Sequence, residues 1–316
     1  MPMRTARLLE AVPNFSEGRD PAVILAIVDA MKASGADILD WSADADHHRS
    51  VVTLVGSPRV VEEAAVAGAR AAIERIDLTR HEGVHPRIGA LDVLPFVPVA
   101  GATLADARDS ARRVGQRLAR ELGIPVYFYG AASEPPGRPL SALRRGGFET
   151  LRTGWPAERP ADVLPERWPH AGAHPTAGVT CVGARPVLLA WNLYLAGVEY
   201  DAARQIARSV RESGGGFLGV RALALRLPSR NRLQISMNIE NLDVTQPMDV
   251  FRRIEELVHA RGGAIEQTEI VGMLPDALLW GAAADRLRLS PDTAQRLLSQ
   301  RLVEVLSEGE RTPQDA

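Results

Sequence analysis

The amino-acid sequence predicts an α/β (α+β) protein made of two similar subdomains, each with a β-α-β-β-α-β core and a mixed sheet. Three observations support this fold class. The same order of strand-like and helix-like segments occurs twice along the chain. A Pro/Gly-rich stretch over residues 131–178 separates the two copies. The 316 residues, 46% hydrophobic and 24% charged, are ordinary for a globular protein of one or two domains. The order is that of a ferredoxin-like core, and we expect a substrate cleft between the copies.

In the first copy, alternating apolar residues predict strands, and helical spacing between capping residues predicts helices. The expected strands cover residues 8–12, 37–42, 50–55, 90–99 and 126–129. The expected helices are one from Asp20 and Pro21 to Gly35, one over 57–76 that starts with Ser57, Pro58, Glu62 and Glu63, and one from Thr103 to about 122. Pro95 and Pro98 predict that the strand over 90–99 lies near a sheet edge or at a bulge.

The second copy follows the Pro/Gly-rich stretch, which we interpret as a functional loop or linker and not as a packed layer. The expected strands are 187–195, 220–227, 232–239 and 264–271, and the expected helices are 199–213 and 247–261. Ser290 and Pro291 start a last helix, and the end of the chain has the composition of a disordered tail. The predicted boundaries are therefore 1–178 for the first subdomain, 179–285 for the second, and 286–316 for the C-terminal helix and tail.

The composition argues against several classes of protein. With Lys+Arg 37 against Asp+Glu 39, the net charge of -2 gives no general attraction to nucleic acid or to an anionic membrane. Cys181 is the only cysteine, which excludes an intrachain disulfide and a cysteine-based metal cluster. No stretch resembles a signal peptide or a membrane span, and neither a Walker loop nor a dinucleotide fingerprint occurs. We expect a cytoplasmic protein without nucleic-acid or membrane partners.

The connector between the helix over 57–76 and the strand over 90–99 is the first candidate for chemistry. It reads RHEGVHPRIGALD from Arg80, and almost none of it suits a core. His85 stands out because an imidazole titrates near neutral pH and can accept and return a proton within one turnover. Arg80 and Arg87 flank it, and we expect them to hold carboxylates and to keep His85 neutral. The alternatives are a solvated loop and, for each arginine, a surface ion pair.

The letters H-E-G-V-H from His81 also match the H-E-x-x-H pattern of zinc peptidases. That pattern binds zinc only on a helix, where residues four apart share a face. Gly83 and Pro86 disfavour a helix here, so we expect no metal. A metal-dependent hydrolase remains an alternative, with four histidines as its ligands: His47, His48, His81 and His85.

Two further polar groups lie between expected elements of the first copy. The turn between the strands over 37–42 and 50–55 contains Asp44, Asp46, His47, His48 and Arg49. Such residues often serve only to make the turn, which is the alternative to a substrate-binding role. Asn14 and Ser16 precede the first helix, whose N-terminus favours anions, although capping alone explains Ser16.

Polar residues also interrupt two strands of the second copy. Asn192 stands within an apolar run, and Gln234, Ser236 and Asn238 fall on one face by alternation. Buried amides need hydrogen-bond partners. The sequence leaves open whether these are neighbouring backbone groups or a ligand lying across the sheet.

Six segments together resemble the glutamate formimidoyltransferase family, over about residues 8–275. They are AVPNFSEGRD, DHHRSVVTLVG, RHEGVHPRIGALDVLPFVPV, GIPVYFYG, HPTAGVTCVGARPVLLAWNLYL and QISMNIEN, in that order. The resemblance implies transfer of the formimino group from N-formimino-L-glutamate to N5 of tetrahydrofolate, giving 5-formiminotetrahydrofolate and L-glutamate. It further implies a homodimer with the substrates in a tunnel between the subdomains. No cyclodeaminase segment follows, so the chain resembles the free-standing transferase of histidine breakdown and one-carbon metabolism.

The resemblance also implies roles for particular residues. The second histidine of the family motif R-H-x-G-x-H-P-R, which is catalytic in the family, is His85 here. The family's folate-binding loop falls on ten residues: Pro169, His170, Ala171, Gly172, Ala173, His174, Pro175, Thr176, Ala177 and Gly178. This chain departs from the family pattern in two places. It has Glu166-Arg167-Trp168-Pro169 in place of D-F-G-P, and His48 in place of the asparagine of D-H-N-R.

The implied substrates suggest a mechanism. His85 accepts the N5 proton as base and returns it to the leaving nitrogen as acid. Asp44 or Asp46 holds the cationic formimino group, and arginines among Arg49, Arg80 and Arg87 hold glutamyl carboxylates. Tetrahydrofolate is a co-substrate, and no metal is needed. A non-catalytic folate-binding or storage protein, which does not need His85, is the second alternative.

Overall fold

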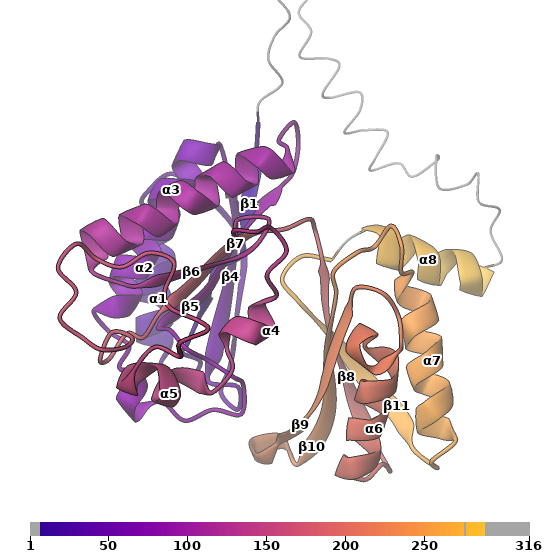
Figure 1. Cartoon of the computed structure of the whole chain (residues 1–316). Helices are drawn as coiled ribbons and strands as arrows, with labels where there is room; N and C mark the ends of the chain where they lie inside the picture. The colour runs from indigo at the N-terminus through magenta and orange to yellow at the C-terminus, as the bar shows by residue number, and fades with distance from the viewer. Residues whose placement is uncertain (1–6, 275, 288–316) are drawn as a thin grey trace, which may run out of the picture.

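The structure, a computed structural model, describes residues 7–274 and 276–287, and these form two mixed α/β subdomains with one sheet each (Figure 1). The strands of the first sheet are β1 (Leu9–Ala11), β2 (Asn14–Phe15), β3 (Asp37–Asp44), β4 (Arg49–Gly56), β5 (Leu91–Pro98), β6 (Val126–Gly130) and β7 (Thr180–Ala184). Its helices are α1 (Pro21–Lys32), α2 (Pro58–Ile73), α3 (Leu104–Leu122), α4 (Leu140–Leu143) and α5 (Gly147–Thr153), with a 3-10 turn at Leu78–Arg80.

The second subdomain is smaller. Its strands are β8 (Leu189–Ala196), β9 (Val220–Leu227), β10 (Arg232–Ile239) and β11 (Ala264–Val271). Its helices are α6 (Tyr200–Val210), α7 (Pro247–His259) and α8 (Asp276–Leu287), with 3-10 turns at Glu212–Gly214 and Pro228–Arg230. The predicted helix from Ser290 and the predicted disordered tail lie outside the described residues.

Both sheets share one strand order. The second runs β11-β8-β10-β9, and all its pairs are antiparallel. In the first sheet, β5, β1/β2, β4 and β3 follow the same order, because β1 and β2 lie together between β4 and β5. The first sheet then continues beyond β5 with β7 and β6, both parallel to their neighbours. The element order β-α-β-β-α-β thus occurs in both halves of the chain.

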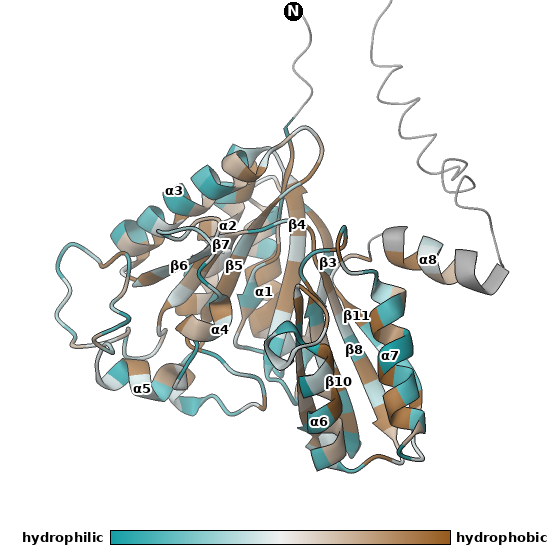
Figure 2. Cartoon of the chain, turned by 45° about the vertical axis from the view of Figure 1, so that its right-hand side comes forward, coloured by the Kyte–Doolittle hydropathy of each residue, from teal (hydrophilic) through white to brown (hydrophobic). Residues whose placement is uncertain are grey.

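Each sheet has helices on its outer face. Helices α1, α2 and α3 cover the first sheet, and α6 and α7 cover the second (Figure 1). The apolar side chains collect between each sheet and its helices, and Figure 2 shows many hydrophilic residues on α3, α6 and α7. Residues on the other faces of the two sheets line a space between the subdomains. Among the described residues no helix has the length and apolarity needed to cross a membrane.

The first subdomain differs from the sequence-based expectations in two places. β7 was not expected, because the segment TCVGA is buried on both faces and shows no alternation. β5 is not an edge strand, since β1 and β7 flank it, but the alternative of a bulge is confirmed, because its pairing with β2 shifts register between Leu91 and Val93. Pro95 is tolerated because it lies opposite Val12, where β1 has already ended, and its carbonyl accepts the Val12 N–H at 3.2 Å.

The Pro/Gly-rich stretch over 131–178 is packed, contrary to expectation. It contains α4 and α5, and Leu143, Leu151 and Ala173 are buried against Tyr127 and Cys181 of the first sheet. A third apolar cluster therefore covers the β6–β7 end of the sheet on the face opposite α3. This packing brings residues of the stretch close to the space between the sheets.

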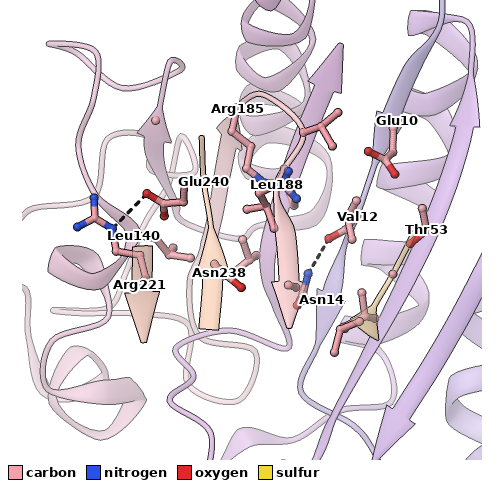
Figure 3. A pocket seen from close by; sticks show the side chains of 18 of the residues that line it. Glu10, Val12, Asn14, Thr53, Leu140, Arg185, Leu188, Arg221, Asn238 and Glu240 are labelled. Carbon is pink, nitrogen blue, oxygen red and sulfur yellow. Dashed lines mark hydrogen bonds and ion pairs between the residues drawn. The ribbon is translucent and has the colours of Figure 1, made fainter. Parts of the chain in front are cut away.

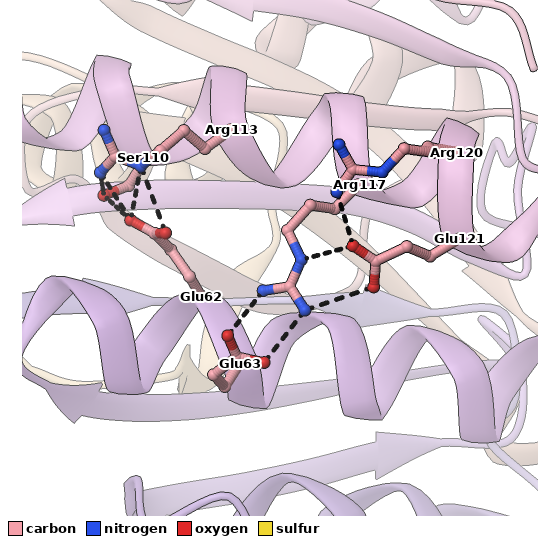
Figure 4. Close-up of polar contacts among 7 residues, drawn as sticks. All are labelled: Glu62, Glu63, Ser110, Arg113, Arg117, Arg120 and Glu121. Atoms are coloured by element: carbon pink, nitrogen blue, oxygen red, sulfur yellow. Dashed lines mark hydrogen bonds and ion pairs between the residues drawn. The ribbon is translucent and has the colours of Figure 1, made fainter.

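Helices α2 and α3 are joined by ion pairs of Glu62 and Glu63 (Figure 4). Both residues lie past the first turn of α2, so they do not start the helix as expected. Glu62 is 9% exposed, and its Oε1 accepts hydrogen bonds from Ser110 Oγ at 2.6 Å and from Arg113 Nη2 at 2.6 Å. Glu63 pairs with Arg117 at 2.9 Å, but its side chain is 50% exposed. Because Glu62 is more buried than Glu63, we expect its contacts to contribute more to the stability of the fold.

We expect Glu62→Ala to lower the free energy of unfolding by about 1–3 kcal/mol, because the buried Ser110 hydroxyl loses its acceptor. The matched variant Glu63→Ala is expected to cost less than about 1 kcal/mol, since water replaces an exposed ion pair. Urea denaturation of the two variants measures both values. Equal losses would show that burial of Glu62 does not decide the effect.

Candidate active site

The two sheets face each other across a cavity of about 890 Å³ that both subdomains line. Figure 3 shows Asn14 of β2 and Thr53 of β4 on one side, and Arg221 of β9 and Asn238 of β10 on the other. Of the residues predicted to bind substrate or act as catalyst, seven line this cavity: Asn14, Asp44, His47, Arg49, His85, Asn192 and Asn238. The lining does not include Ser16, Asp46, Arg80, Arg87 or any residue of 169–178.

His85 lies at the cavity on the irregular connector between the 3-10 turn at Leu78–Arg80 and β5. Its Nδ1 lies 2.8 Å from the carbonyl oxygen of Pro86. A carbonyl can only accept, so Nδ1 carries the hydrogen and the Nε2 of the neutral ring keeps its lone pair. The geometry therefore leaves Nε2 as the basic atom.

Burial and two neighbouring arginines keep His85 neutral. Burial first, then the positive charges of Arg49 and Arg144, hold the pKa of His85 well below its usual value. The expectation of a neutral His85 was correct in direction, but Arg80 and Arg87 do not cause it. Arg80 is exposed, and Arg87 pairs with Glu149 at 2.7 Å.

Asp92 joins these two arginines. It is fully buried, and its Oδ2 accepts a hydrogen bond from Arg49 Nη1 at 2.7 Å and another from Arg144 Nη2. Its Oδ1 accepts the backbone N–H of Ile88 at 2.8 Å, which ties the connector of His85 to β5. Burial raises the pKa of Asp92, but Arg144 and Arg49 outweigh this effect and bring it to about 2. Desolvation lowers the pKa of Arg49 to about 10, so both groups stay charged at neutral pH.

Asn14 lies on β2, and Ser16 follows that strand directly. Their hydrogen bonds support the group formed by His85, Arg49, Arg144 and Asp92. Asn14 Oδ1 accepts from Arg49 Nη2 at 2.9 Å and Nε at 3.1 Å, while its amide donates to Val12 O at 2.6 Å. Ser16 is 1% exposed, and its hydroxyl donates to Gly89 O at 2.7 Å. The structure thus gives Ser16 a contact with the connector and not with the cavity.

The turn between β3 and β4 contacts the second subdomain. Asp44 pairs with Arg230 at 2.8 Å, and Asp46 accepts the hydroxyl of Ser229 at 2.5 Å. His47 Nε2 lies 3.1 Å from Gln234 Oε1, and its ring centroid is 5.8 Å from that of His85. These contacts hold the subdomains together beside the basic histidine.

His48 and His81 form a stacked pair on the other side of that turn. Their ring centroids are 4.1 Å apart, and His81 Nε2 donates to His48 O at 2.8 Å. His48 has a φ of 50°, a left-handed conformation that asparagine adopts more readily than most residues. The pattern D-H-N-R fits this backbone, and here histidine occupies the same conformation. Burial is the main reason that the pKa of His81 falls to about 4.

The segment H-E-G-V-H does not form the helix that a zinc site of this pattern needs. Residues 81–87 lie outside helices and strands, and a Cβ on Gly83 would lie 2.5 Å from His47 O. Glycine is therefore required for the close approach of the connector to the β3–β4 turn. Within the described part of the chain, no group of three or more His, Cys, Asp or Glu residues is arranged to hold a metal ion.

The polar face of the second sheet forms as the alternation predicted. Asn192 lies between Ser236 and Glu269 in register, and its amide donates to Glu269 Oε2 at 3.1 Å. Tyr194 also donates to Glu269, at 2.7 Å, and accepts from Arg230 Nη1 at 3.0 Å. Many polar groups on this face thus have hydrogen-bond partners among the side chains of the sheet, while Asn238 is exposed to the cavity.

The segment 169–178 packs against the back of the connector. His174 Nδ1 accepts the N–H of Ala177 at 3.0 Å, and Leu78 N–H donates to Thr176 O at 2.8 Å. Gly178 has a φ of 73°, and a Cβ there would lie 2.0 Å from Ile88 O. In the structure this segment supports the residues just before β5, the strand that contains Asp92.

Sequence reasoning missed three residues of this centre: Asp92, Arg144 and Glu269. Asp92 looks like an ordinary polar position of a strand, and only the irregular pairing of β2 with β5 shows why it is buried. Arg144 lies in the stretch that was not expected to pack. The one available signal was a carboxylate inside the most apolar strand of the first copy.

The matching family models and the curated relatives agree on one family. A family model described as "Formiminotransferase domain, N-terminal subdomain" matches residues 8–185, and one described as "Formiminotransferase domain" matches residues 190–290. A glutamate formimidoyltransferase of Streptococcus pyogenes serotype M1 is 38% identical over 305 residues, covering 94% of this chain and 99% of that protein. One of Thermoplasma acidophilum is 37% identical and covers 93% and 97%. A formimidoyltransferase-cyclodeaminase of Sus scrofa is 40% identical over 88% of this chain, which spans 52% of that protein.

Proposed function

Because this chain belongs to the formiminotransferase domain family, we propose that it transfers the formimino group of N-formimino-L-glutamate to N5 of tetrahydrofolate. Both full-length relatives described above are glutamate formimidoyltransferases by name. Tetrahydrofolate is a co-substrate in this proposal. The observation that carries it is a histidine with a free Nε2 at a cavity lined by buried cations from the first subdomain and by amides from the second.

His85 performs both proton transfers. The N5 amine attacks the amidine carbon, and the His85 Nε2 takes the N5 proton, which leaves a tetrahedral intermediate. The protonated ring then gives that proton to the glutamate nitrogen, and the bond between this nitrogen and the former amidine carbon breaks. The low pKa of His85 keeps it in the basic form before the attack, and makes its conjugate acid a strong proton donor afterwards.

The cavity has polar groups for both substrates. Asp44 is the last residue of β3, and its carboxylate, which also pairs with Arg230, is at the cavity for the protonated formimino group. Arg49 offers a positive charge to a carboxylate. Asn192 and Asn238 present amides from the opposite sheet. Tetrahydrofolate lies between the two ferredoxin-like halves in this proposal. The role of residues 169–178 in folate binding stays a prediction, and their packing supports an indirect role through the connector.

Two further parts of the proposal concern organisation. We place the subdomain boundary between β7 and β8 and not at 178/179, because β7 pairs with β5 and β6. Homodimer formation and a cytoplasmic location stay predictions. Sedimentation of the purified protein tests the first.

The direct test is to mix the purified protein with formiminoglutamate and tetrahydrofolate and to follow 5-formiminotetrahydrofolate. Release of free formamide or ammonia without tetrahydrofolate would identify a hydrolase instead. Folate binding without turnover would identify a storage protein.

We expect Glu82→Gln to keep turnover within about twofold and prolonged chelation to leave it unchanged. In a zinc site of the H-E-x-x-H type, the glutamate acts as general base and its loss would cost several orders of magnitude. Here the Glu82 side chain is exposed, and its backbone carbonyl makes the contacts with Arg19 and His48. Steady-state assays before and after chelation, with elemental analysis, decide between the two mechanisms. Loss of activity in both experiments would favour the hydrolase.

A further inference from the structure

Arg144 reaches the cavity from the residue after α4, on the packed stretch over 131–178. Its Nη2 donates to Asp92, and its side chain is only 14% exposed. Its Nε is buried and has no hydrogen-bond partner among the described residues. A buried guanidinium N–H without an acceptor is costly, so this group is ready for a ligand oxygen.

The charge around Arg144 is not balanced. Arg49 and Arg144 share the single carboxylate of Asp92, which leaves one net positive charge at this end of the cavity. Arg49 already donates to Asn14 through Nε and Nη2, so most of the N–H groups of its guanidinium have acceptors. Arg144 has the greater capacity for a new anionic partner.

We propose that Arg144, assisted by Arg49, binds the α-carboxylate of the formimino donor and thereby determines donor specificity. This inference rests on the proposed function. The α-carboxylate is attached to the carbon that carries the leaving nitrogen, and the γ-carboxylate is two carbons farther away. His85 must lie beside the leaving nitrogen when it protonates that atom. Arg144, whose positive charge acts on His85, is therefore close to the α-carboxylate at that step.

A substrate-by-variant comparison tests this assignment. N-formimino-4-aminobutyrate keeps the γ-carboxylate of the donor and lacks the α-carboxylate. We expect Arg144→Met to lower kcat/KM for formiminoglutamate by about ten- to a hundredfold, and for formimino-4-aminobutyrate by less than about threefold. The matched control Arg145→Met removes an exposed neighbour outside the cavity lining and should change neither value. Equal losses on both donors would overturn the proposal.

Two readouts separate this role from a folding effect and from a contact with folate. Arg144→Lys keeps a positive charge and should recover part of the activity, and it remains informative if Arg144→Met does not fold. In Arg144→Met the loss of a cation raises the pKa of His85, so the acidic limb of kcat/KM moves to higher pH, and Arg144→Lys moves it back. If only the KM for tetrahydrofolate rose, Arg144 would be assigned to the glutamyl carboxylate of folate, and the proposal would be wrong.

Calorimetry with L-glutamate distinguishes failure of this inference from failure of the proposed function, because it needs no turnover. We expect L-glutamate to bind the wild-type protein and to bind Arg144→Met about tenfold or more weakly. Equal binding to both proteins would overturn the role of Arg144, whatever the activity. Absence of formimino transfer by a wild-type protein that shows this difference would overturn the proposed function only.

Discussion

Replacement of His85 by alanine is expected to lower turnover by about 10²–10⁴-fold, the usual contribution of a general acid–base group. In the part of the chain that the structure describes, the His85 ring makes a hydrogen bond with Pro86 O and a tilted ring contact with His47. Its removal therefore leaves the fold and the folate affinity nearly unchanged. Single-turnover kinetics with saturating tetrahydrofolate measures the chemical step, and added imidazole should restore part of the rate.

His259 supplies the matched control, because it is an exposed histidine at the end of α7 and does not line the cavity. His259→Ala should keep full turnover. Retention of more than about a tenth of wild-type turnover by His85→Ala would assign the base to another group. The wild-type kcat/KM should also stay flat near neutral pH and fall only in acid, because the base has a lowered pKa and must be unprotonated.

Asp92→Asn is expected to cause the largest loss of stability, about 3–5 kcal/mol in the free energy of unfolding. The substitution keeps the shape of the side chain but leaves the buried Arg49 and Arg144 guanidiniums without a counter-charge. Guanidinium denaturation measures the loss. The control Asp109→Asn breaks an exposed ion pair with Arg108 and should cost less than about 0.5 kcal/mol.

The same variant predicts a pH dependence. The folded-state pKa of Asp92 lies below the value of an unfolded chain, so its contribution is complete above about pH 4 and is lost as the pH falls toward 2. Asp92→Asn should lack this component of acid destabilisation. A loss of less than 1 kcal/mol at neutral pH would mean that water or a mobile ion compensates the arginines.

The elements of the second subdomain could be predicted closely from the sequence, for a physical reason. Its strands are half-buried and antiparallel, so alternation shows their two faces. The face with Gln234, Ser236 and Asn238 was recognised in this way. β7 gave no such signal, because a short strand buried on both sides has no polar face.

The candidate site was predictable only in part. His85 was found because its connector contains residues that no core would accept. Its real electrostatic partners come from β4, β5 and the residue after α4, and no local pattern in the sequence brings Arg144 beside Asp92. Arg80 and Arg87 are neighbours of His85 in sequence, but the backbone carries both away from the cavity. Sequence proximity was the wrong guide to electrostatic proximity.

The late position of β7 in the chain has a consequence for biosynthesis. All strands of the second sheet come from one contiguous stretch, whereas the first sheet is incomplete until residues 180–184 leave the ribosome. Until then β5 is an open edge and β6 has no partner strand in the sheet. An apolar open edge invites pairing with other nascent chains, and proline hinders such pairing. Pro95 and Pro98, unusual in a central strand, thus stand where the growing chain is temporarily exposed to aggregation.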